Sequence, residues 1–251
     1  EAVRPGRGRW GFAAVAAALV AGAHGVGAAL LDDAEYGDAP LRVGLFQSNF
    51  AQEIKWDPAF TLTMLGMAAE QSRALAEEGQ TDLLVWPETL ITAPPTREEV
   101  YTVLRTLAEG TGNALYAGAT RTDPEGRGEF NASVFVDGHG AIVDYYDKIH
   151  LAPFGEYIPF GDRLPFLRQV VPVGDLLPGQ TPKVFPVRDR AFGPLICFEV
   201  LFPAMAAELR ERGADFLVVI TNLGWFGMSS AIPQELEIAR FRAVENRLPL
   251  V

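Results

Sequence analysis

Short apolar runs alternate with amphipathic stretches from about residue 41 to the end of the chain. The apolar runs end at turn-forming residues, and they predict β-strands at 41–47, 81–86, 114–119, 131–136, 141–146, 192–198 and 214–221. Apolar residues repeat with helical spacing in four longer stretches, which predicts helices at 57–78, 98–110, 203–213 and 233–246. The turn 137–140 (DGHG) predicts a hairpin between two of the strands. Strands alternating with helices are typical of an α/β fold with helices packed on sheets.

A different segment precedes this region, because no charged residue occurs from Trp10 to Leu31. As a helix it would be about 33 Å long, which is enough to cross the hydrocarbon core of a bilayer. Basic residues precede it and acidic residues follow it, namely Arg4, Arg7 and Arg9, then Asp32, Asp33, Glu35 and Asp38. Since positive charge remains on the cytoplasmic side, residues 1–40 are predicted to be a cytoplasmic basic flank, a transmembrane helix at about 10–31 and an acidic linker. A secretory signal peptide, which would also export the domain, and a buried alanine-rich helix are the alternatives.

The composition is that of a globular protein, with 49% hydrophobic and 21% charged residues in 251. The net charge of −11 argues against nucleic-acid binding, because it repels the phosphate backbone. A single cysteine excludes an internal disulfide, and three scattered histidines predict no metal site. The chain starts with Glu and ends within an apolar stretch, so we expect a fragment whose domain at 41–251 is truncated at its C-terminus.

Three side chains with useful chemistry stand at the ends of predicted strands. Glu88 follows a strand that Pro87 is expected to stop, Lys148 ends the hairpin, and Cys197 is the only thiol. Open α/β sheets usually bind ligands at such strand ends. A thiol nucleophile needs a base, and its acyl intermediate needs a cation or donors at the oxyanion. Glu, Lys and Cys together supply these parts and predict an acyl-transfer site.

Simpler explanations of the same residues remain open on position and residue type alone. A cysteine at the end of a buried strand is most often a small core residue. Glu88 and Lys148 can be solvated turn residues. A pair of Cys197 with His150 is a further alternative, although a structural or exposed histidine is favoured.

The sequence segments around these residues resemble the nitrilase, or carbon–nitrogen hydrolase, superfamily, and within it the apolipoprotein N-acyltransferase family. The resemblance extends nearly continuously over 41–251 and rests on VGLFQSNFAQEIKWDP (43–58), VWPET (85–89), YDKIHLAPFGEYIPF (146–160), PGQTPKVF (178–185), LICFEVLFP (195–203), ITNLGWFG (220–227) and PQELEIARFRAVENRLPLV (233–251). It implies a nitrilase-type four-layer α-β-β-α sandwich preceded by one transmembrane helix. It also implies a place in the bacterial inner (cytoplasmic) membrane, with the catalytic domain on the periplasmic side.

The resemblance implies roles for seven residues. Cys197 would be the nucleophile, Glu88 the general base and acid, and Lys148 the group that stabilises the tetrahedral oxyanion. The others are Glu156 and Glu199 as supporting active-site carboxylates, and Phe198 and Trp225 as substrate-binding residues. The implied reaction moves an acyl chain from a phospholipid, through a cysteine thioester, to the α-amine of the N-terminal diacylglyceryl-cysteine of a lipoprotein. The implied partners are these two substrates and the membrane, and no cofactor or metal is implied.

Three positions depart from the usual pattern of the resembled family: Phe198 stands where tyrosine is usual, Leu223 where aspartate is usual, and Glu235 where histidine is usual. Two rival functions follow. One is an exported carbon–nitrogen hydrolase of the amidase or nitrilase kind, which would pass the same thioester to water. The other is a non-catalytic lipid-binding relative, for which Leu223 and Glu235 are the hints. The presence of all three triad residues favours an enzyme.

Overall fold

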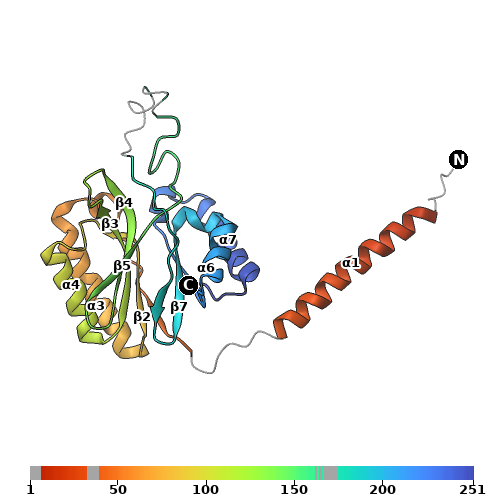
Figure 1. Ribbon diagram of the computed structural model, residues 1–251, viewed down its shortest axis with the longest axis horizontal. Helices are drawn as coiled ribbons and strands as arrows, with labels where there is room; N and C mark the ends of the chain where they lie inside the picture. The colour runs from red at the N-terminus through yellow and green to blue at the C-terminus, as the bar shows by residue number, and fades with distance from the viewer. Residues whose placement is uncertain (1–6, 33–39, 162, 164–165, 167–174) are drawn as a thin grey trace. The chain divides into compact units, whose positions relative to one another are not determined.

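The computed structural model describes residues 7–32, 40–161, 163, 166 and 175–251. The chain divides into two compact units, residues 1–40 and residues 41–251 (Figure 1). The first unit contains helix α1 (Arg7–Asp32), in which Trp10–Ala29 is long and apolar enough to cross a membrane. The apolar run therefore forms a helix, as its composition predicts.

The second unit has four layers, with two sheets face to face and helices on both outer sides (Figure 1). The larger sheet has the order β1-β2-β3-β4-β5, formed by Val43–Leu45, Leu83–Ile91, Ala114–Thr122, Glu129–Val136 and Ile142–Asp147. The smaller sheet has the order β6-β7-β8, formed by Phe185–Val187, Arg190–Ile196 and Phe216–Ile220. The main helices are α3 (Thr61–Gly79) and α4 (Glu98–Thr111) on one side, and α6 (Pro203–Glu211) and α7 (Ala231–Asn246) on the other. The predicted α-β-β-α sandwich is confirmed.

The parallel pairing of β1, β2 and β3 places the carboxyl ends of these three strands at the same edge of the larger sheet. In the larger sheet β1, β2 and β3 are parallel, and β4 and β5 continue it as an antiparallel hairpin. In the smaller sheet β6 is antiparallel to β7, and β7 is parallel to β8. Short helical segments follow or precede the strands, namely α2 (Gln52–Lys55), η1 (Pro58–Phe60), η2 (Cys197–Leu201) and η3 (Leu223–Phe226).

Strand β2 is buried on both faces, which explains its continuous apolar sequence. Leu83 and Val85 belong to a core that also contains Phe192 of the smaller sheet. Leu84 and Trp86 belong to a second core, which includes residues of α3 and α4. Successive side chains of a strand point to opposite faces, so one strand contributes to both cores.

Two strand predictions need correction. Pro87 does not stop its strand, since β2 continues to Ile91. Proline cannot donate a ladder hydrogen bond and is confined to edges or bulges. Here the pairing with β1 ends at Val85 and the register with β3 shifts between Trp86 and Ile91, so an irregular segment accommodates the ring and places Glu88 within the strand. Strand β6 was not predicted, because the central residue of its three is Pro186, and a proline argues against a strand.

The bulge in β2 lies directly against Gly118 of β3. A Cβ atom on Gly118 would be 2.5 Å from the Cα atom of Glu88 and 2.5 Å from the carbonyl oxygen of Pro87. Both neighbours are backbone atoms, which cannot rotate away. The absence of a side chain at Gly118 therefore allows β2 to hold Glu88 where it is.

We expect Gly118→Ala to lower the free energy of unfolding by about 1–3 kcal/mol, because overpacking forces backbone shifts. The matched control is Gly66→Ala on α3, where an added Cβ would meet no atom within 4 Å. That control should be neutral or stabilising by up to about 1 kcal/mol, since alanine favours helix. Denaturant unfolding compares the two, and equal midpoints would contradict the close approach.

Candidate active site

The structure brings together the three side chains singled out in the sequence, although Glu88 lies within its strand and not at its end. Glu88 lies on β2, Lys148 directly follows β5, and Cys197 directly follows β7 at the start of η2. All three residues are buried, with Lys148 only 1% exposed. Two of them come from the larger sheet and one from the smaller sheet, so the site lies where the two sheets meet.

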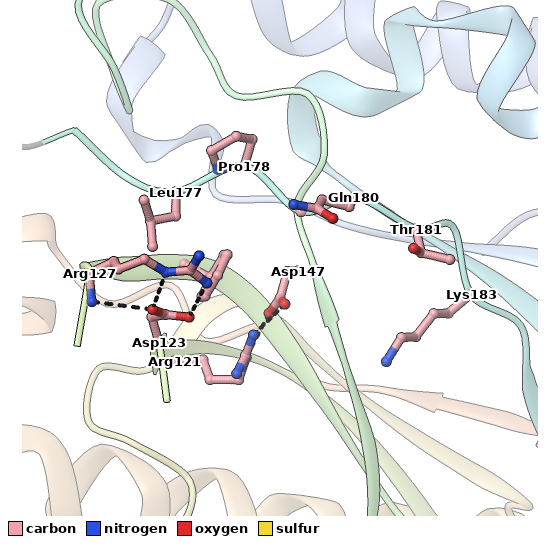
Figure 2. Close-up of a pocket in the computed structure, with 11 residues that line it drawn as sticks. Arg121, Asp123, Arg127, Asp147, Leu177, Pro178, Gln180, Thr181 and Lys183 are labelled. Carbon is pink, nitrogen blue, oxygen red and sulfur yellow. Dashed lines mark hydrogen bonds and ion pairs between the residues drawn. The ribbon is translucent and has the colours of Figure 1, made fainter. Parts of the chain in front are cut away.

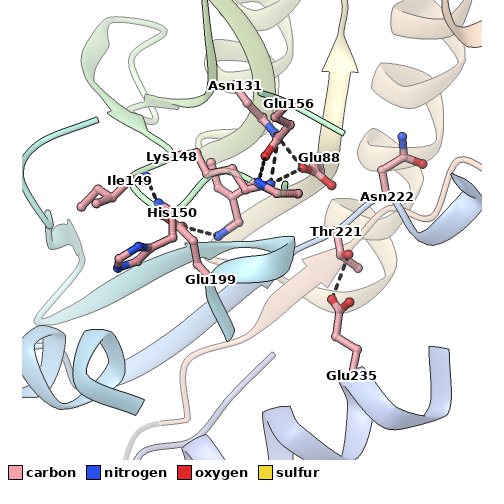
Figure 3. A network of polar contacts seen from close by, with 12 residues as sticks. Glu88, Asn131, Lys148, Ile149, His150, Glu156, Glu199, Thr221, Asn222 and Glu235 are labelled. Carbon is pink, nitrogen blue, oxygen red and sulfur yellow. Dashed lines mark hydrogen bonds and ion pairs between the residues drawn. The ribbon is translucent and has the colours of Figure 1, made fainter. Parts of the chain in front are cut away.

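Lys148 is held between two carboxylates. Its Nζ atom is 3.3 Å from Oε1 of Glu88 and 3.0 Å from Oε1 of Glu156 (Figure 3). Burial by itself lowers the pKa of a lysine, but the two carboxylates outweigh it and raise the pKa of Lys148 above its ordinary value. Lys148 is therefore a permanent ammonium, and Glu156 directly contacts it.

Asn131 on β4 completes this network, and sequence reasoning missed it. Its Nδ2 atom donates to Oε1 of Glu88 at 2.7 Å and also to Oε1 of Glu156. The backbone joins it as well, because the carbonyl oxygen of Asn131 accepts from the amide of Lys148 at 2.8 Å. Only the β4–β5 register brings Asn131 beside Lys148, so no local sequence signal could have identified it.

Cys197 stands on a strained turn. Its φ angle is +48°, in the left-handed region that side chains other than glycine rarely adopt. The strand ends at Ile196 and η2 begins at once, so the thiol projects from a sharp strand-to-helix corner. Backbone strain of this kind is concentrated at functional sites.

Glu199 fixes that corner to the segment that carries Lys148. One oxygen accepts from the amide of Ile196 at 2.8 Å, and the other accepts from the amide of Ile149 at 2.6 Å and from the hydroxyl of Tyr146 at 2.8 Å. The side chain is fully buried, and this burial raises its pKa. Glu199 thus connects the two sheets behind the site, and its contacts are those of a positioning residue.

The electrostatic surroundings keep the Cys197 thiol protonated. Burial and then the negative charge of Glu88 raise its pKa to about 12, against a smaller lowering by Lys148. Glu235 raises the thiol pKa further, and the neighbouring Thr221 side chain lowers it. A thiol in this state could act as a nucleophile at neutral pH only with a base that removes its proton, and Glu88 is the carboxylate with the largest effect on it.

Lys55 is a second buried lysine at the site, and sequence reasoning assigned it no role. Its Nζ atom donates to the main-chain oxygen of Glu88 at 2.9 Å. Burial lowers its pKa to about 8, partly opposed by Glu88. The contact braces the backbone of the β2 bulge from the side of α2. Next to Lys55, the exposed ring of Trp56 lies 6.3 Å from that of Trp225.

The remaining candidates from the sequence lie around this centre. Phe198 is half-buried, and its ring meets Phe202 edge-on at 5.5 Å. Trp225 on η3 is 64% exposed. The ring of His150 stacks on Phe202 at 4.0 Å, which is a structural contact and does not favour a pair with Cys197. In the described residues, no group of three or more His, Cys, Asp or Glu side chains is arranged to hold a metal ion.

A cavity of about 430 Å³ lies elsewhere, beside β3, β4 and β5 (Figure 2). None of the seven residues nominated from the sequence lines it. Its arginines are paired with carboxylates, Arg121 with Asp147 and Arg127 with Asp123. Because these charges are already compensated, the cavity offers no strong anion site.

The chain belongs to the carbon–nitrogen hydrolase family, whose model matches residues 42–251. Its sequence is 37% identical over 219 residues to an apolipoprotein N-acyltransferase of Geobacter metallireducens, covering 86% of this chain and 42% of that protein. A similar relative from Pseudomonas syringae is 33% identical, covering 95% of this chain and 48% of that protein. The chain thus spans about half the length of the curated relatives it matches.

Solved structures of the nitrilase superfamily share the fold. A cysteine-to-alanine mutant of an amidase from Nesterenkonia AN1 matches with a TM-score of 0.60 and 27% identity, covering 85% of this chain and 77% of that one. A second structure of that amidase, a glutamate-to-glutamine mutant, shows Michael addition of acrylamide at the active-site cysteine (TM-score 0.55, 25% identity, covering 84% and 77%). The comparisons support an enzyme of the carbon–nitrogen hydrolase superfamily.

Proposed function

We propose that this chain carries the acyl-transfer site of an apolipoprotein N-acyltransferase, with a Glu88–Lys148–Cys197 triad. The observation that carries the proposal is the buried Lys148 ammonium, held between two carboxylates, within electrostatic range of a protonated thiol. The curated relatives support the choice of reaction within the superfamily.

In the first half-reaction the thiol takes an acyl chain from a phospholipid. Glu88 accepts the Cys197 proton as sulfur attacks the ester carbonyl carbon, and a carbon–sulfur bond forms. Lys148 stabilises the negative charge that develops on the carbonyl oxygen. The ester carbon–oxygen bond then breaks, and Glu88 returns the proton to the departing lysophospholipid oxygen.

In the second half-reaction the α-amine of a diacylglyceryl-cysteine attacks the thioester. A carbon–nitrogen bond forms, the carbon–sulfur bond breaks, and a proton from the nitrogen passes through Glu88 to the leaving sulfur. Lys148 again faces the oxyanion. Glu156 and Asn131 hold Lys148 and Glu88 at hydrogen-bond distance from each other, which is the preorganisation that this chemistry requires.

Exposed apolar side chains beside the site support a lipid substrate. We call Trp56, Trp225, Phe226 and Met228 the apolar rim; all four are exposed, Met228 completely. The rim adjoins the site on both of its segments. Lys55, next to Trp56, contacts the backbone of Glu88. Gln52 of the same helix hydrogen-bonds Asn222, which directly precedes η3 with Trp225, at 2.9 Å. Exposed aromatic and apolar groups of this size mark surfaces that bind apolar partners.

The proposal includes the inner membrane as the location. Helix α1 has the length and composition of a membrane span. Arginines precede the apolar segment Trp10–Ala29 and acidic residues follow it, and by the positive-inside rule this charge asymmetry supports a catalytic unit on the periplasmic side.

An amidase or nitrilase-like hydrolase is the second candidate, because the structural neighbours quoted above are amidases. It would use the same thioester and pass it to water. The products distinguish the two functions: a phospholipid donor leaves a lysophospholipid, whereas a small amide releases ammonia.

We expect the full-length protein in detergent to gain the mass of a fatty acyl chain when incubated with phosphatidylethanolamine. Hydroxylamine should remove the adduct, because it cleaves thioesters. Cys197→Ala should gain no mass while its free energy of unfolding stays within about 1 kcal/mol of wild type, since a small buried side chain is shortened by one atom. Intact mass spectrometry makes the measurement.

An adduct that persists in Cys197→Ala would contradict the thioester mechanism. A correctly folded wild-type protein that gains no acyl mass, but hydrolyses small amides, would favour the amidase function. The apolar rim would then need another explanation.

A further inference from the structure

Glu235 of α7 lies beside Cys197, on the side of β8. Its Oε1 atom accepts from the hydroxyl of Thr221 at 3.0 Å. Thr221 and Cys197 directly follow the paired residues Ile220 and Ile196 of the parallel strands β8 and β7, so Thr221 stands next to Cys197. Figure 3 shows the Glu235 side chain reaching from its helix toward Thr221, apart from the cluster of Glu88, Lys148 and Glu156. The carboxylate thus stands one side chain away from the nucleophile.

This carboxylate differs from the other two at the site. Glu88 and Glu156 share the Lys148 ammonium, whereas among the residues that the structure describes Glu235 forms no ion pair and has the Thr221 hydroxyl as its polar partner. Glu235 is only half-buried, so a ligand can reach it. A carboxylate without a counter-ion, close to a nucleophile and open on one side, favours a cationic group of the substrate.

The proposed acceptor carries such a group. An α-amine has an ordinary pKa of about 7.7–8.0, so it arrives mostly as an ammonium at neutral pH. On the side of Glu88, both carboxylates already pair with the Lys148 ammonium, so neither is a free counter-ion for the amine. On the side of β8 and α7, Glu235 has no cationic partner among the described residues and would attract the amine next to Thr221 and Cys197.

We propose that Glu235 binds the α-ammonium of the acyl acceptor and removes one of its protons before the attack on the thioester; this inference rests on the proposed function. The ammonium loses one proton to Glu235 and becomes a neutral amine. Its lone pair attacks the thioester carbon, the carbon–sulfur bond breaks, and the second nitrogen proton passes to the sulfur through Glu88. Glu235 then releases its proton to water. Burial raises the pKa of Glu235, which suits a group that accepts a proton.

The test separates the two half-reactions in Glu235→Gln, using the full-length protein in detergent. Acylation by phosphatidylethanolamine should be unchanged or faster, because removing the Glu235 charge lowers the thiol pKa. Transfer from the preformed acyl-enzyme to a synthetic diacylglyceryl-cysteinyl peptide should be about 10- to 100-fold slower, with a higher KM for the peptide, since a charge-assisted hydrogen bond is lost. Glu235→Asp should restore part of the transfer rate.

Two controls make the result specific. Glu237→Gln changes an exposed carboxylate of the same helix, which pairs with Arg240, and should leave both steps unchanged. Hydroxylamine is an uncharged nucleophile at neutral pH, so it should cleave the acyl-enzymes of wild type and Glu235→Gln at equal rates.

Other outcomes would overturn the inference. Equal slowing of both half-reactions in Glu235→Gln indicates a structural role, and an unchanged transfer rate after normal acylation indicates a spectator. Either result leaves the proposed function intact. A wild-type protein that forms no acyl-enzyme overturns the proposed function, and the inference with it.

Discussion

Replacing Glu88 by glutamine is expected to abolish acyl transfer and, at the same time, to make the Cys197 thiol more reactive toward iodoacetamide. The loss follows because the thiol no longer has a base, which contributes about 10²- to 10⁴-fold to such reactions. The gain follows because the Glu88 charge raises the thiol pKa, so its removal lowers that pKa from about 12. For each unit by which the thiol pKa falls, the thiolate fraction rises about tenfold while the nucleophilicity of the thiolate decreases. Alkylation at fixed pH should therefore become about threefold faster per pKa unit.

The measurement is the alkylation rate between pH 7 and pH 10, followed by mass spectrometry. Wild type should show a rate that rises throughout this range without a plateau, because the thiol pKa of about 12 lies above it. Glu88→Gln should react faster at every pH. Glu109→Gln, an exposed carboxylate on α4 that pairs with Arg105, serves as the control and should match wild type. A slower reaction in Glu88→Gln would contradict the electrostatic account of the thiol.

Acrylamide gives a second probe of the same effect. Because the Glu88 charge raises the thiol pKa, Glu88→Gln should add acrylamide faster than wild type, and it should still fail to transfer an acyl group.

Lys148→Met is expected to give the second large effect, on stability as well as on activity. The substitution removes the ammonium and leaves Glu88 and Glu156 as buried carboxylates without their counter-ion. Breaking a buried ion pair on one side costs about 3–5 kcal/mol of unfolding free energy. Acylation should be lost because the oxyanion has no cation. Alkylation of Cys197 should become slower than in wild type, since Lys148 lowers the thiol pKa.

A second substitution tests the reason for that instability. The double variant Lys148→Met, Glu156→Gln has one uncompensated buried carboxylate fewer than Lys148→Met. It should therefore regain part of the lost unfolding free energy, while acyl transfer stays absent. Denaturant unfolding followed by tryptophan fluorescence measures both variants. Lys183→Met breaks a more exposed ion pair with Asp144 and should cost less than about 1 kcal/mol. An unchanged midpoint in Lys148→Met would mean that its charge does not stabilise the site.

Much of the fold could be predicted from the chain alone. The two-residue period of strands and the 3.6-residue period of helices are local signals, and they predicted most elements to within a few residues. Cys197 was expected at a strand end for this reason. The Pro87 prediction failed because a local rule about proline did not anticipate a bulge opposite Gly118, which has no Cβ atom to prevent the close approach.

The contacts within the candidate site depend on residues far apart in the chain. Asn131 is placed beside Lys148 by the β4–β5 register, and Glu199 connects η2 to the segment after β5. Lys55 approaches the β2 bulge from α2. In the sequence Asn131, Glu199 and Lys55 are far apart, and no regular spacing relates them.

The sequence by itself determined the alternation of elements, the apolar helix and the position of Lys148 and Cys197 at strand ends, because each depends on neighbours a few residues away. Only the tertiary structure decided which charges meet. It gave Lys148 two carboxylates, gave Glu88 a buried lysine behind its backbone, and left Glu235 with a hydroxyl as its polar partner in the described part of the chain. The physical reason is that electrostatic interactions act through space, so their strength depends on the packing of two sheets and not on order along the chain.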